Sequence, residues 1–406
     1  GIASIAVTDM DGRPTRHAGR GGLGAVMGSK RIKAIVVDDQ GAELSKAKEE
    51  ETFKVLVAKF AKDTAAAKKT LTRLGTANLV KPVNALGGLP TRNYSKGQYE
   101  GADKISGERL VELIAERGGR TGHPCHPGCV IRCSNVINNA EGNHLTSALE
   151  YETIVLLGSN LEIDDLDAIG EMDRFCDNFG SDTMETGHAL AVAMEAGLAP
   201  FGDKSAALDL LEEISRQTPL GRILGQGATV AGKVLGVKRV AAVKGQGMAA
   251  YDPRIFKGTG ISYATSPMGA DHTAGNCLPG RGGYHYDTRT PLETTQIEGQ
   301  ERLSRDMQVL TTVMDVLGMC FFAGATYENV CLLAEMTTAL YGIKVGPVDL
   351  LDLSEETLLR ERDFNRRAGF TEVHDRLPEF MREEPLAPRD QVFDVPDVAL
   401  DRVFKR

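Results

Sequence analysis

Four cysteines carry the clearest chemistry in this sequence. Three fall within nine residues, in Cys125-His-Pro-Gly-Cys129-Val-Ile-Arg-Cys133, and the fourth is the distant Cys320. Three clustered thiols with one remote thiol are a common ligand set for a [4Fe–4S] cluster, because each iron takes one thiolate. The pattern therefore predicts a metal centre in which these four cysteines are the ligands.

The segment that holds the first three cysteines is predicted to be a loop. On a continuous helix they would spread over about 12 Å, at 1.5 Å per residue, too far for one compact cluster. Pro124, Pro127 and Gly128 disfavour such a helix, because proline removes a hydrogen-bond donor and clashes with the preceding turn. A zinc site that combines these cysteines with His123 or His126 is the alternative that spacing alone leaves open.

Residues 177–182 and 315–320 share one spacing. Each has a glycine three residues after an aspartate, and a polar or thiol side chain two residues after that glycine. Asp182 also suits a helix N-cap. Asp315 lies in a strongly apolar run and needs a specific partner there, because an unpaired buried charge is costly. The repeated spacing favours a ligand that both segments share.

Three further segments could contribute polar groups to a site. The glycine-rich residues 19–28 predict a turn that comes close to a phosphate, with Arg20 as a partner, although a purely structural turn explains them equally well. His272 follows an aspartate in a glycine-rich loop, which is typical of a polar site. Glu150 and Glu152 would point in different directions on a helix, so at most one faces a given site.

The elements that must position these groups are mostly helices. A strand is predicted over residues 2–9, a hairpin turn at Asp11-Gly12, a buried strand over residues 32–37 and a long structured loop over residues 244–292. The chain opens in the middle of a strand-like pattern, so we expect an N-terminally incomplete β domain. Helices are predicted over residues 47–80, 107–117, 149–159, 164–179, 184–196, 206–225, 228–235, 300–345 and 354–368.

The composition narrows the class of protein. The formal net charge is −9, which argues against nucleic acid as a main partner. No apolar run approaches the roughly 20 residues of a membrane span, and the clustered, odd-numbered cysteines suit a reducing compartment, so we expect a cytoplasmic protein. The other three cysteines are predicted to be buried structural thiols: Cys176, Cys277 and Cys331.

Together the motifs resemble the tungsten-dependent aldehyde ferredoxin oxidoreductase family, in family order from residue 1 to about 345. The matching segments are the glycine-rich residues 19–30, Leu89-Pro-Thr-Arg-Asn93, the triple-cysteine loop, Glu150-Tyr-Glu-Thr, Asp177-x-x-Gly-x-Asp182, Tyr251-Asp-Pro-Arg, Tyr263-Ala-Thr-Ser and Asp315-x-x-Gly-x-Cys320.

The resemblance implies a mostly α-helical multidomain fold, that is, family domains 2 and 3 with the remnant of an N-terminal β domain. The implied division is residues 1–40, 41–200 with the Fe–S loop, and 201–406 completing the cofactor site. Such enzymes oxidise an aldehyde to the carboxylic acid with water at a tungsten or molybdenum bis-molybdopterin. Electrons pass through a [4Fe–4S] cluster to ferredoxin or another Fe–S acceptor, and the protein is expected as a homodimer or with an electron-transfer subunit.

The resemblance also implies a role for each candidate residue. Arg20 and Gly21 would contact the pterin phosphates and a bridging magnesium, and Glu150 or Glu152 with His272 would transfer protons near the metal. The cluster ligands would be Cys125, Cys129, Cys133 and Cys320. The two pterins would be held by Asp177, Ser181, Asp182, Asp315, Gly318 and Met319.

Two departures from the family pattern bear on the substrate. Ser181 and Met319 stand where the family has leucine, and three residues separate the first two cysteines where some members have two. A related tungsten or molybdenum pterin enzyme acting on another carbonyl or carboxylate is therefore an alternative. From a different class, a non-catalytic Fe–S electron carrier or a zinc-stabilised helical protein would need neither the pterin aspartates nor His272.

Overall fold

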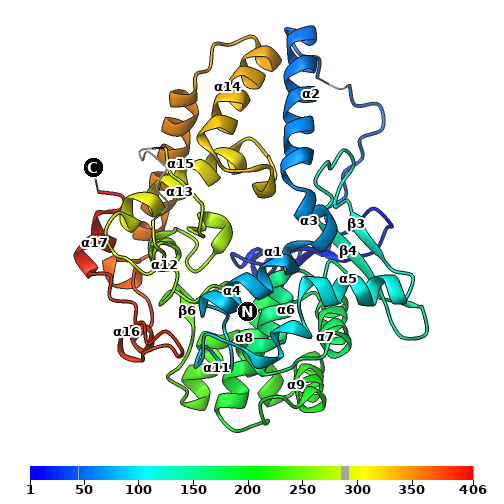
Figure 1. The fold of residues 1–406 in the computed structure, drawn as a ribbon, viewed down its shortest axis with the longest axis vertical. Helices are drawn as coiled ribbons and strands as arrows, with labels where there is room; N and C mark the ends of the chain where they lie inside the picture. Colours follow the sequence, from blue (N-terminus) through cyan, green and yellow to red (C-terminus); the bar gives the residue numbers. More distant parts are fainter. Residues whose placement is uncertain (44, 285–291, 406) are drawn as a thin grey trace.

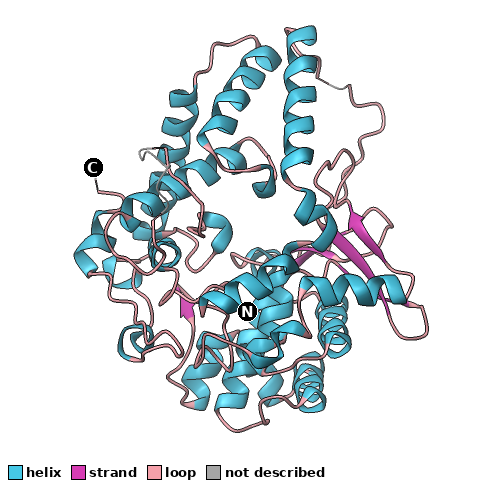
Figure 2. Cartoon of the chain, viewed as in Figure 1, coloured by secondary structure: helices cyan, strands magenta, loops and turns pink. Residues whose placement is uncertain are grey.

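Helices make up most of the structure and gather around two hydrophobic cores (Figures 1 and 2). The computed structural model describes residues 1–43, 45–284 and 292–405. The predicted mostly helical fold is confirmed, although the described residues also form three small antiparallel sheets.

The first core lies in the lower half of Figure 1, around α8 (Thr183–Glu195). Residues 184–194 of this helix are all buried, as expected for a central helix that is covered on every side. α8 packs against α6 (Tyr151–Leu157), α7 (Leu166–Phe179), α10 (Pro219–Leu224) and α11 (Ala228–Leu235). The other helices of this part of the chain are α4 (Val80–Leu86), α5 (Gly107–Glu116) and α9 (Lys204–Arg216).

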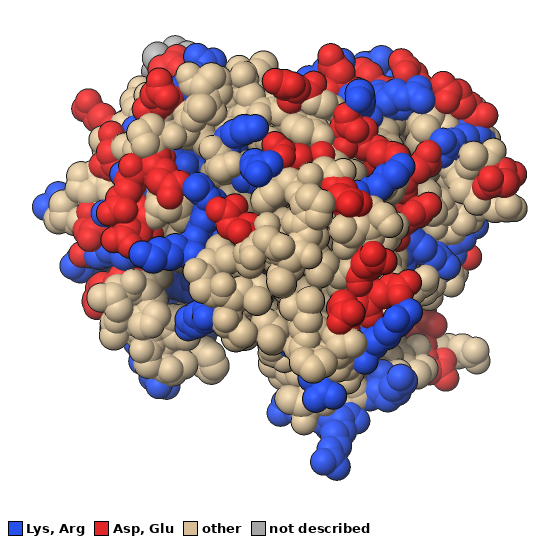
Figure 3. All heavy atoms as spheres, turned by 90° about the horizontal axis from the view of Figure 1, so that it is seen from below, with Lys and Arg blue, Asp and Glu red and all other residues tan. Residues whose placement is uncertain are grey.

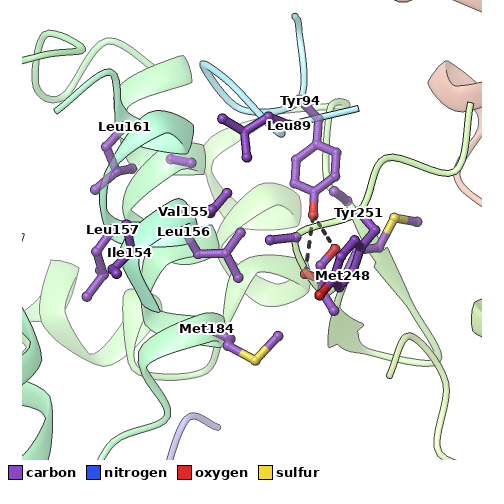
Figure 4. Close-up of a cluster of buried hydrophobic side chains, with 14 of the residues drawn as sticks. Leu89, Tyr94, Ile154, Val155, Leu156, Leu157, Leu161, Met184, Met248 and Tyr251 are labelled. Atoms are coloured by element: carbon purple, nitrogen blue, oxygen red, sulfur yellow. Dashed lines mark hydrogen bonds between the residues drawn. The ribbon is translucent and has the colours of Figure 1, made fainter. Parts of the chain in front are cut away.

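Tyr94 shows how polar atoms are accommodated in this core (Figure 4). The ring is fully buried, and its hydroxyl donates to the backbone oxygens of Met248, at 3.3 Å, and Ala249, at 2.9 Å. A buried tyrosine hydroxyl needs such a partner, because an unsatisfied donor costs about 1–3 kcal/mol. These bonds connect the loop after α4 to the segment that follows β7.

The second core joins helices from opposite ends of the sequence. The long α2 (Glu50–Ala67) lies beside α14 (Tyr327–Tyr341) at the top of Figure 1.

The remaining helices are α1 (Leu23–Ser29), α3 (Lys69–Leu74), α12 (Lys257–Thr265), α13 (Gln300–Val316), α15 (Pro347–Arg367), α16 (Glu379–Glu383) and α17 (Asp397–Arg402).

The three sheets are all antiparallel. The first is the hairpin β1 (Ile5–Val7) and β2 (Arg16–Ala18), which includes the predicted Asp11-Gly12 turn. The second, in the order β3-β4-β5, is formed by β3 (Arg120–His123), β4 (Ser134–Asn138) and β5 (His144–Ser147). The third is the short pair β6 (Ala242–Val243) and β7 (Gln246–Gly247).

Several sequence predictions of secondary structure are wrong. The helices predicted over residues 47–80, 206–225 and 300–345 are each interrupted in the structure. Residues 32–37 form no strand, and Ile35, Val36 and Val37 are 75–89% exposed, because none of the described strands pairs with this segment. The predicted loop over residues 244–292 contains the buried helix α12, whose glycines and small polar residues hid its helical period. Residues 285–291 of that loop lie outside the described part of the chain.

Candidate active site

The cysteine loop connects β3 to β4 and has the predicted non-helical conformation. Positive φ angles at Gly128 (80°) and Arg132 (53°) curl it. The sulfurs of Cys125 and Cys129 and a ring nitrogen of His126 lie within 4.8 Å of one another. The Cys129 sulfur also accepts a hydrogen bond from the Arg132 amide, at 3.3 Å.

Cys133 and Cys320 are not part of this 4.8 Å group, but negative charge on them acts on the same thiols. Burial raises the pKa of the Cys133 thiol, and negative charge on Glu150, Cys320, Cys125 and Cys129 raises it further. Thiolates that disfavour one another in this way are stabilised by a cationic metal centre. Four thiols of this kind fit the ligand set of an iron–sulfur cluster.

Cys320 reaches this group from the end of α13. The helix ends at Val316, Gly318 adopts a positive φ of 66°, and Cys320 precedes the short 3₁₀ turn Phe321–Ala323. Gly318 and Met319 therefore lie in the tight link between Asp315 and Cys320.

The outlying cysteines differ in burial. Cys176 and Cys277 are buried as predicted, whereas Cys331 is only partly buried on α14, so its prediction as a core thiol is wrong.

A cavity of about 1020 Å³ lies beside the glycine-rich segment. Arg20, Gly21, Asp182 and Asp315 all line it, so the structure brings together four of the predicted cofactor residues. Asp177 and Ser181 do not line it. The cavity is large enough for a sizeable anionic ligand, since typical small-molecule pockets measure about 300–1,000 Å³.

Arg20 is the main cation of the cavity wall. Its guanidinium donates to the backbone oxygens of Gly247 and Ala270, the latter at 2.8 Å, and lies 3.5 Å from a carboxylate oxygen of Asp182. Its Nε is buried without a partner. Such an unused donor can bind a phosphate or another anion in the cavity.

The glycines around Arg20 permit close contacts. A Cβ on Gly19 would come within 3.2 Å of an Asp182 oxygen, and one on Gly21 within 3.1 Å of the Met268 sulfur. Gly21 also has a φ of 74°, which other residues rarely adopt. The helix α1 that follows was not predicted from the glycine-rich sequence.

The turn between α7 and α8 gives the predicted residues of the first aspartate segment different surroundings. Asp182 caps α8 through the amides of Met184 and Glu185, and burial raises the pKa of its carboxyl to about 6 although Arg20 opposes the shift. Ser181 is buried and forms an isolated β-bridge with Ala3. Asp182 therefore both caps α8 and lines the cavity.

Asp315 has different surroundings from those that the sequence predicted. It is exposed at the last turn of α13 and faces the cavity. Desolvation by the surrounding cavity wall and the negative charge of Asp271 raise the pKa of Asp315. Desolvation and the negative charge of Asp315 likewise raise the pKa of Glu361, which lines the same cavity. The expectation of a buried aspartate was wrong because the apolar face of α13 ends before this residue.

His272 lies between two carboxylates. Its Nε2 is 3.4 Å from Glu152 Oε1, and its Nδ1 is 3.4 Å from Asp271 Oδ1. Burial would lower the pKa of His272, but the two carboxylates outweigh burial and raise it. Burial also raises the pKa of Glu152, despite His272 and the Ala250 amide. The pair can hold a proton between Nε2 and Oε1.

Glu150 and Glu152 point to different sites, as the helical spacing predicted. Glu152 contacts His272, whereas Glu150 accepts a hydrogen bond from Thr76, at 2.7 Å, and lies near Cys133. Only Glu152 therefore belongs with His272.

Sequence reasoning missed several residues of the cavity. Gln246 accepts a hydrogen bond from the Gly21 amide, at 2.9 Å, and Asp271 and Glu361 provide acidic groups on the wall. The turn Lys244-Gly-Gln-Gly between β6 and β7 was a usable signal for Gln246. Glu361 had none, because it occupies one exposed position of a long charged helix.

The surface carries charges of both signs. On the face in Figure 3, acidic and basic side chains are intermingled around a largely uncharged centre. Among the described residues, no helix is both long and apolar enough to cross a membrane.

Comparison with known proteins identifies relatives along the whole chain. A family model for aldehyde ferredoxin oxidoreductase, domains 2 and 3, matches residues 53–406, and one for the N-terminal domain matches residues 1–39. The tungsten-containing aldehyde ferredoxin oxidoreductases of Pyrococcus horikoshii and Pyrococcus furiosus are 34% and 32% identical over 395 and 394 residues. These matches cover 91% of this chain and 63% of each relative, so the chain spans less than two thirds of their length.

Two further proteins are similar at lower identity. An aliphatic sulfonate oxidoreductase, WOR-like subunit, from Pyrococcus furiosus is 29% identical over 290 residues, which is 65% of this chain and 45% of that protein. The solved active-site complex BamBC of benzoyl coenzyme A reductase with 1,5-dienoyl-CoA shares the fold, with a TM-score of 0.73 and 16% identity. That match covers 99% of this chain and 67% of the solved chain.

Proposed function

Because the chain belongs to the aldehyde ferredoxin oxidoreductase family, we propose that it oxidises an aldehyde to a carboxylic acid with water. The observation that carries the proposal is the polar cavity of about 1020 Å³, with Arg20 and Asp315 on its wall. Two electrons leave each aldehyde and pass singly to ferredoxin or another Fe–S acceptor.

The cavity residues fit an anionic metallopterin. Arg20 has a free buried donor, Gly19 and Gly21 line the cavity without side chains, and Asp182 and Asp315 can accept hydrogen bonds from pterin nitrogens. Arg20 and Gly21 would hold the pterin phosphates and the magnesium ion that these phosphates bind. When bound, a tungsten or molybdenum bis-molybdopterin supplies the two-electron redox chemistry.

Asp177 is a weaker part of this assignment. One of its oxygens pairs with His17 and the other is buried without a partner, so it has one acceptor left for a pterin. Ser181, Gly318 and Met319 would act by shaping the two turns that carry the aspartates.

Protons of the reaction are assigned to Glu152 and His272. Water that attacks an aldehyde carbon must lose a proton, and a carboxylate at 3.4 Å from an imidazole can accept it and share it with Nε2. Asp271 Oδ1 lies 3.4 Å from the other ring nitrogen and adds a second negative charge beside the imidazole. Glu150, beside Cys133, is left outside this step and acts on the cluster ligands.

The thiols of Cys125, Cys129, Cys133 and Cys320 are assigned to a [4Fe–4S] cluster that carries electrons out. Cys320 connects the proposed cluster to the cavity, because Asp315, which lines the cavity, lies only five residues earlier in the chain.

A different substrate is the second candidate. The similarity to a protein named aliphatic sulfonate oxidoreductase, WOR-like subunit, favours a related oxidoreductase that acts on another carbonyl-forming substrate. In both candidates the cofactors and the roles of Glu152 and His272 are the same.

Elemental analysis and turnover together test the proposal. Protein purified without oxygen is analysed for W, Mo, Fe and Zn, and then supplied with a panel of aldehydes and a viologen dye as electron acceptor. We expect tungsten or molybdenum, about four irons per chain and aldehyde-dependent dye reduction. Zinc on the cysteines, with no tungsten or molybdenum, would contradict it. Dye reduction by sulfonates alone would support the second candidate.

A further inference from the structure

A second group of metal-ligand side chains lies apart from the four cysteines. Asp9 and Asp11, in the β1–β2 turn, and His123, the last residue of β3, each place one ligand atom within 4.8 Å of the others. None of the three lines the large cavity. His123 places its ligand atom with these two carboxylates, whereas the histidine grouped with Cys125 and Cys129 is His126.

His123 has an unsatisfied atom in this group. The residue is 1% exposed, and its Nε2 has no hydrogen-bond partner. The closest acceptor is Asp9 Oδ2, at 3.9 Å, which is too far for a hydrogen bond. A buried ring nitrogen without a partner is costly, and a ligand between the two residues removes that cost.

Asp9 is held as a preformed carboxylate ligand. Its Oδ1 accepts the amides of Asp11, at 2.8 Å, and Arg13, at 2.9 Å, while Oδ2 accepts the Thr15 hydroxyl at 3.2 Å. The remaining lone pairs of Oδ2 are available on the side of His123. The hydrogen bonds fix the orientation of the carboxylate, so a metal would not have to order it.

Arg120 supplies positive charge to the same group. Its NH2 lies 2.6 Å from Asp11 Oδ2 and 2.9 Å from His123 Nδ1. A donor at Nδ1 leaves the proton of the neutral ring on Nε2, so a metal at Nε2 requires Arg120 to leave and that proton to move to Nδ1. The Arg120 side chain is 52% exposed and is free to turn into solvent.

We propose that Asp9, Asp11 and His123 bind a divalent transition-metal ion that displaces Arg120. One imidazole nitrogen and two carboxylates suit Mn²⁺, Fe²⁺ or Zn²⁺ better than Mg²⁺ or Ca²⁺, which prefer all-oxygen sites. The ion would connect the β1–β2 hairpin, which leads into the Arg20 segment, to the strand that leads into the cysteine loop. It is a structural site, separate from the redox centres.

Manganese is the probe that tests the site, because it has little affinity for thiolates. The protein with its own cofactors is treated with EDTA, desalted and titrated with Mn²⁺, and free Mn²⁺ is measured by EPR. We expect in the wild type a saturable site that is at least tenfold weaker in Asp11→Asn and tighter in Arg120→Gln. Any Mn²⁺ that replaces the proposed magnesium at the pterin phosphates should bind equally in all three proteins. Asp38→Asn is the control, because Asp38 is an exposed aspartate like Asp11 but lies outside this group.

A second measurement separates loss of the site from loss of the fold. Mn²⁺ should raise the melting temperature of the wild type and of Asp38→Asn, but not that of Asp11→Asn, whose melting temperature without metal should match the wild type because Asp11 is exposed. The absence of a saturable site in the wild type, or equal Mn²⁺ affinity in Asp11→Asn, would overturn the proposal.

Discussion

His17 Nε2 lies 3.2 Å from Asp177 Oδ1, and this pair joins the β1–β2 hairpin to the end of α7. The other ring nitrogen is 2.7 Å from the Ser4 hydroxyl. Burial alone would lower the pKa of His17, but Asp177 outweighs burial and the pKa is raised. The histidine therefore favours its charged form in the folded protein.

This pair predicts a pH dependence of stability. Because the pKa of His17 is higher in the folded than in the unfolded protein, the charged ring stabilises the fold. This stabilisation is complete at pH values below the unfolded-state pKa of about 6.5, and it is lost as the pH rises through the folded-state pKa. The melting temperature of the wild type should therefore exceed that of His17→Gln more at pH 6 than at pH 8.5. His374→Gln, at an exposed histidine, should show no such trend. An equal difference at both pH values would contradict the prediction.

Cys320→Ser should lose or convert the iron–sulfur cluster, because serine replaces one of four thiolate ligands. Iron content and the EPR signal of the reduced protein measure the effect. Cys331→Ser is the control: Cys331 is a partly buried cysteine on α14, and its iron content should stay at the wild-type value. About four irons per chain with an unchanged spectrum in Cys320→Ser would remove this residue from the ligand set.

Glu152→Gln and His272→Gln should each lower kcat by about 10²–10⁴-fold with tungsten and iron content unchanged, since general acid–base catalysis has this magnitude. Glu150→Gln is a close control, two residues away and directed at Thr76, and it should keep most of the activity. Steady-state rates with metal analysis of each variant test this assignment. A slow Glu150→Gln beside a normal Glu152→Gln would reverse it.

Arg20→Gln should reduce the amount of bound metallopterin, because it removes the main cation of the cavity and leaves Asp182 beside Glu185 without a counter-charge. The pterin and tungsten contents of purified protein are the measurement, with Lys33→Gln as an exposed control. Wild-type pterin content in Arg20→Gln would show that Arg20 does not hold the cofactor.

Gly24→Ala should destabilise the protein by about 1–3 kcal/mol, as overpacking does, because the new Cβ would lie 2.3 Å from the Ala3 carbonyl oxygen. Gly28→Ala, in the same helix, has open space around the Cβ and should be neutral or stabilising by up to about 1 kcal/mol. Urea unfolding of the two variants tests the contrast, and equal stabilities would contradict it.

Much of the helical fold was predictable because apolar spacing and helix caps agree. Residues 228–235 were predicted as a helix and form α11, and Asp182 caps α8 as expected. The strand predicted at residues 32–37 failed because a strand depends on a partner that the local sequence does not specify. The domain boundaries at residues 40 and 200 and the roles of the site residues remain predictions.

Contacts between residues that are far apart in the sequence were harder to predict from the sequence. The sequence marked Glu152 and His272 separately, but only the fold shows their contact, since more than a hundred residues separate them. Asp9 and His123 carried no recognisable metal motif, because their ligand set combines two elements whose packing no local pattern specifies.

Asp315 and Cys320 would hold the two proposed cofactors, and the short backbone between these residues limits how far apart the cofactors can lie. Five residues span at most about 18 Å even when fully extended, and the turn at Gly318 shortens the link further. Rearrangements of the surrounding helices cannot lengthen this path beyond the reach of the backbone. Inserting one residue there should change the electron-transfer rate between the proposed cofactors while sparing the ligands at both ends.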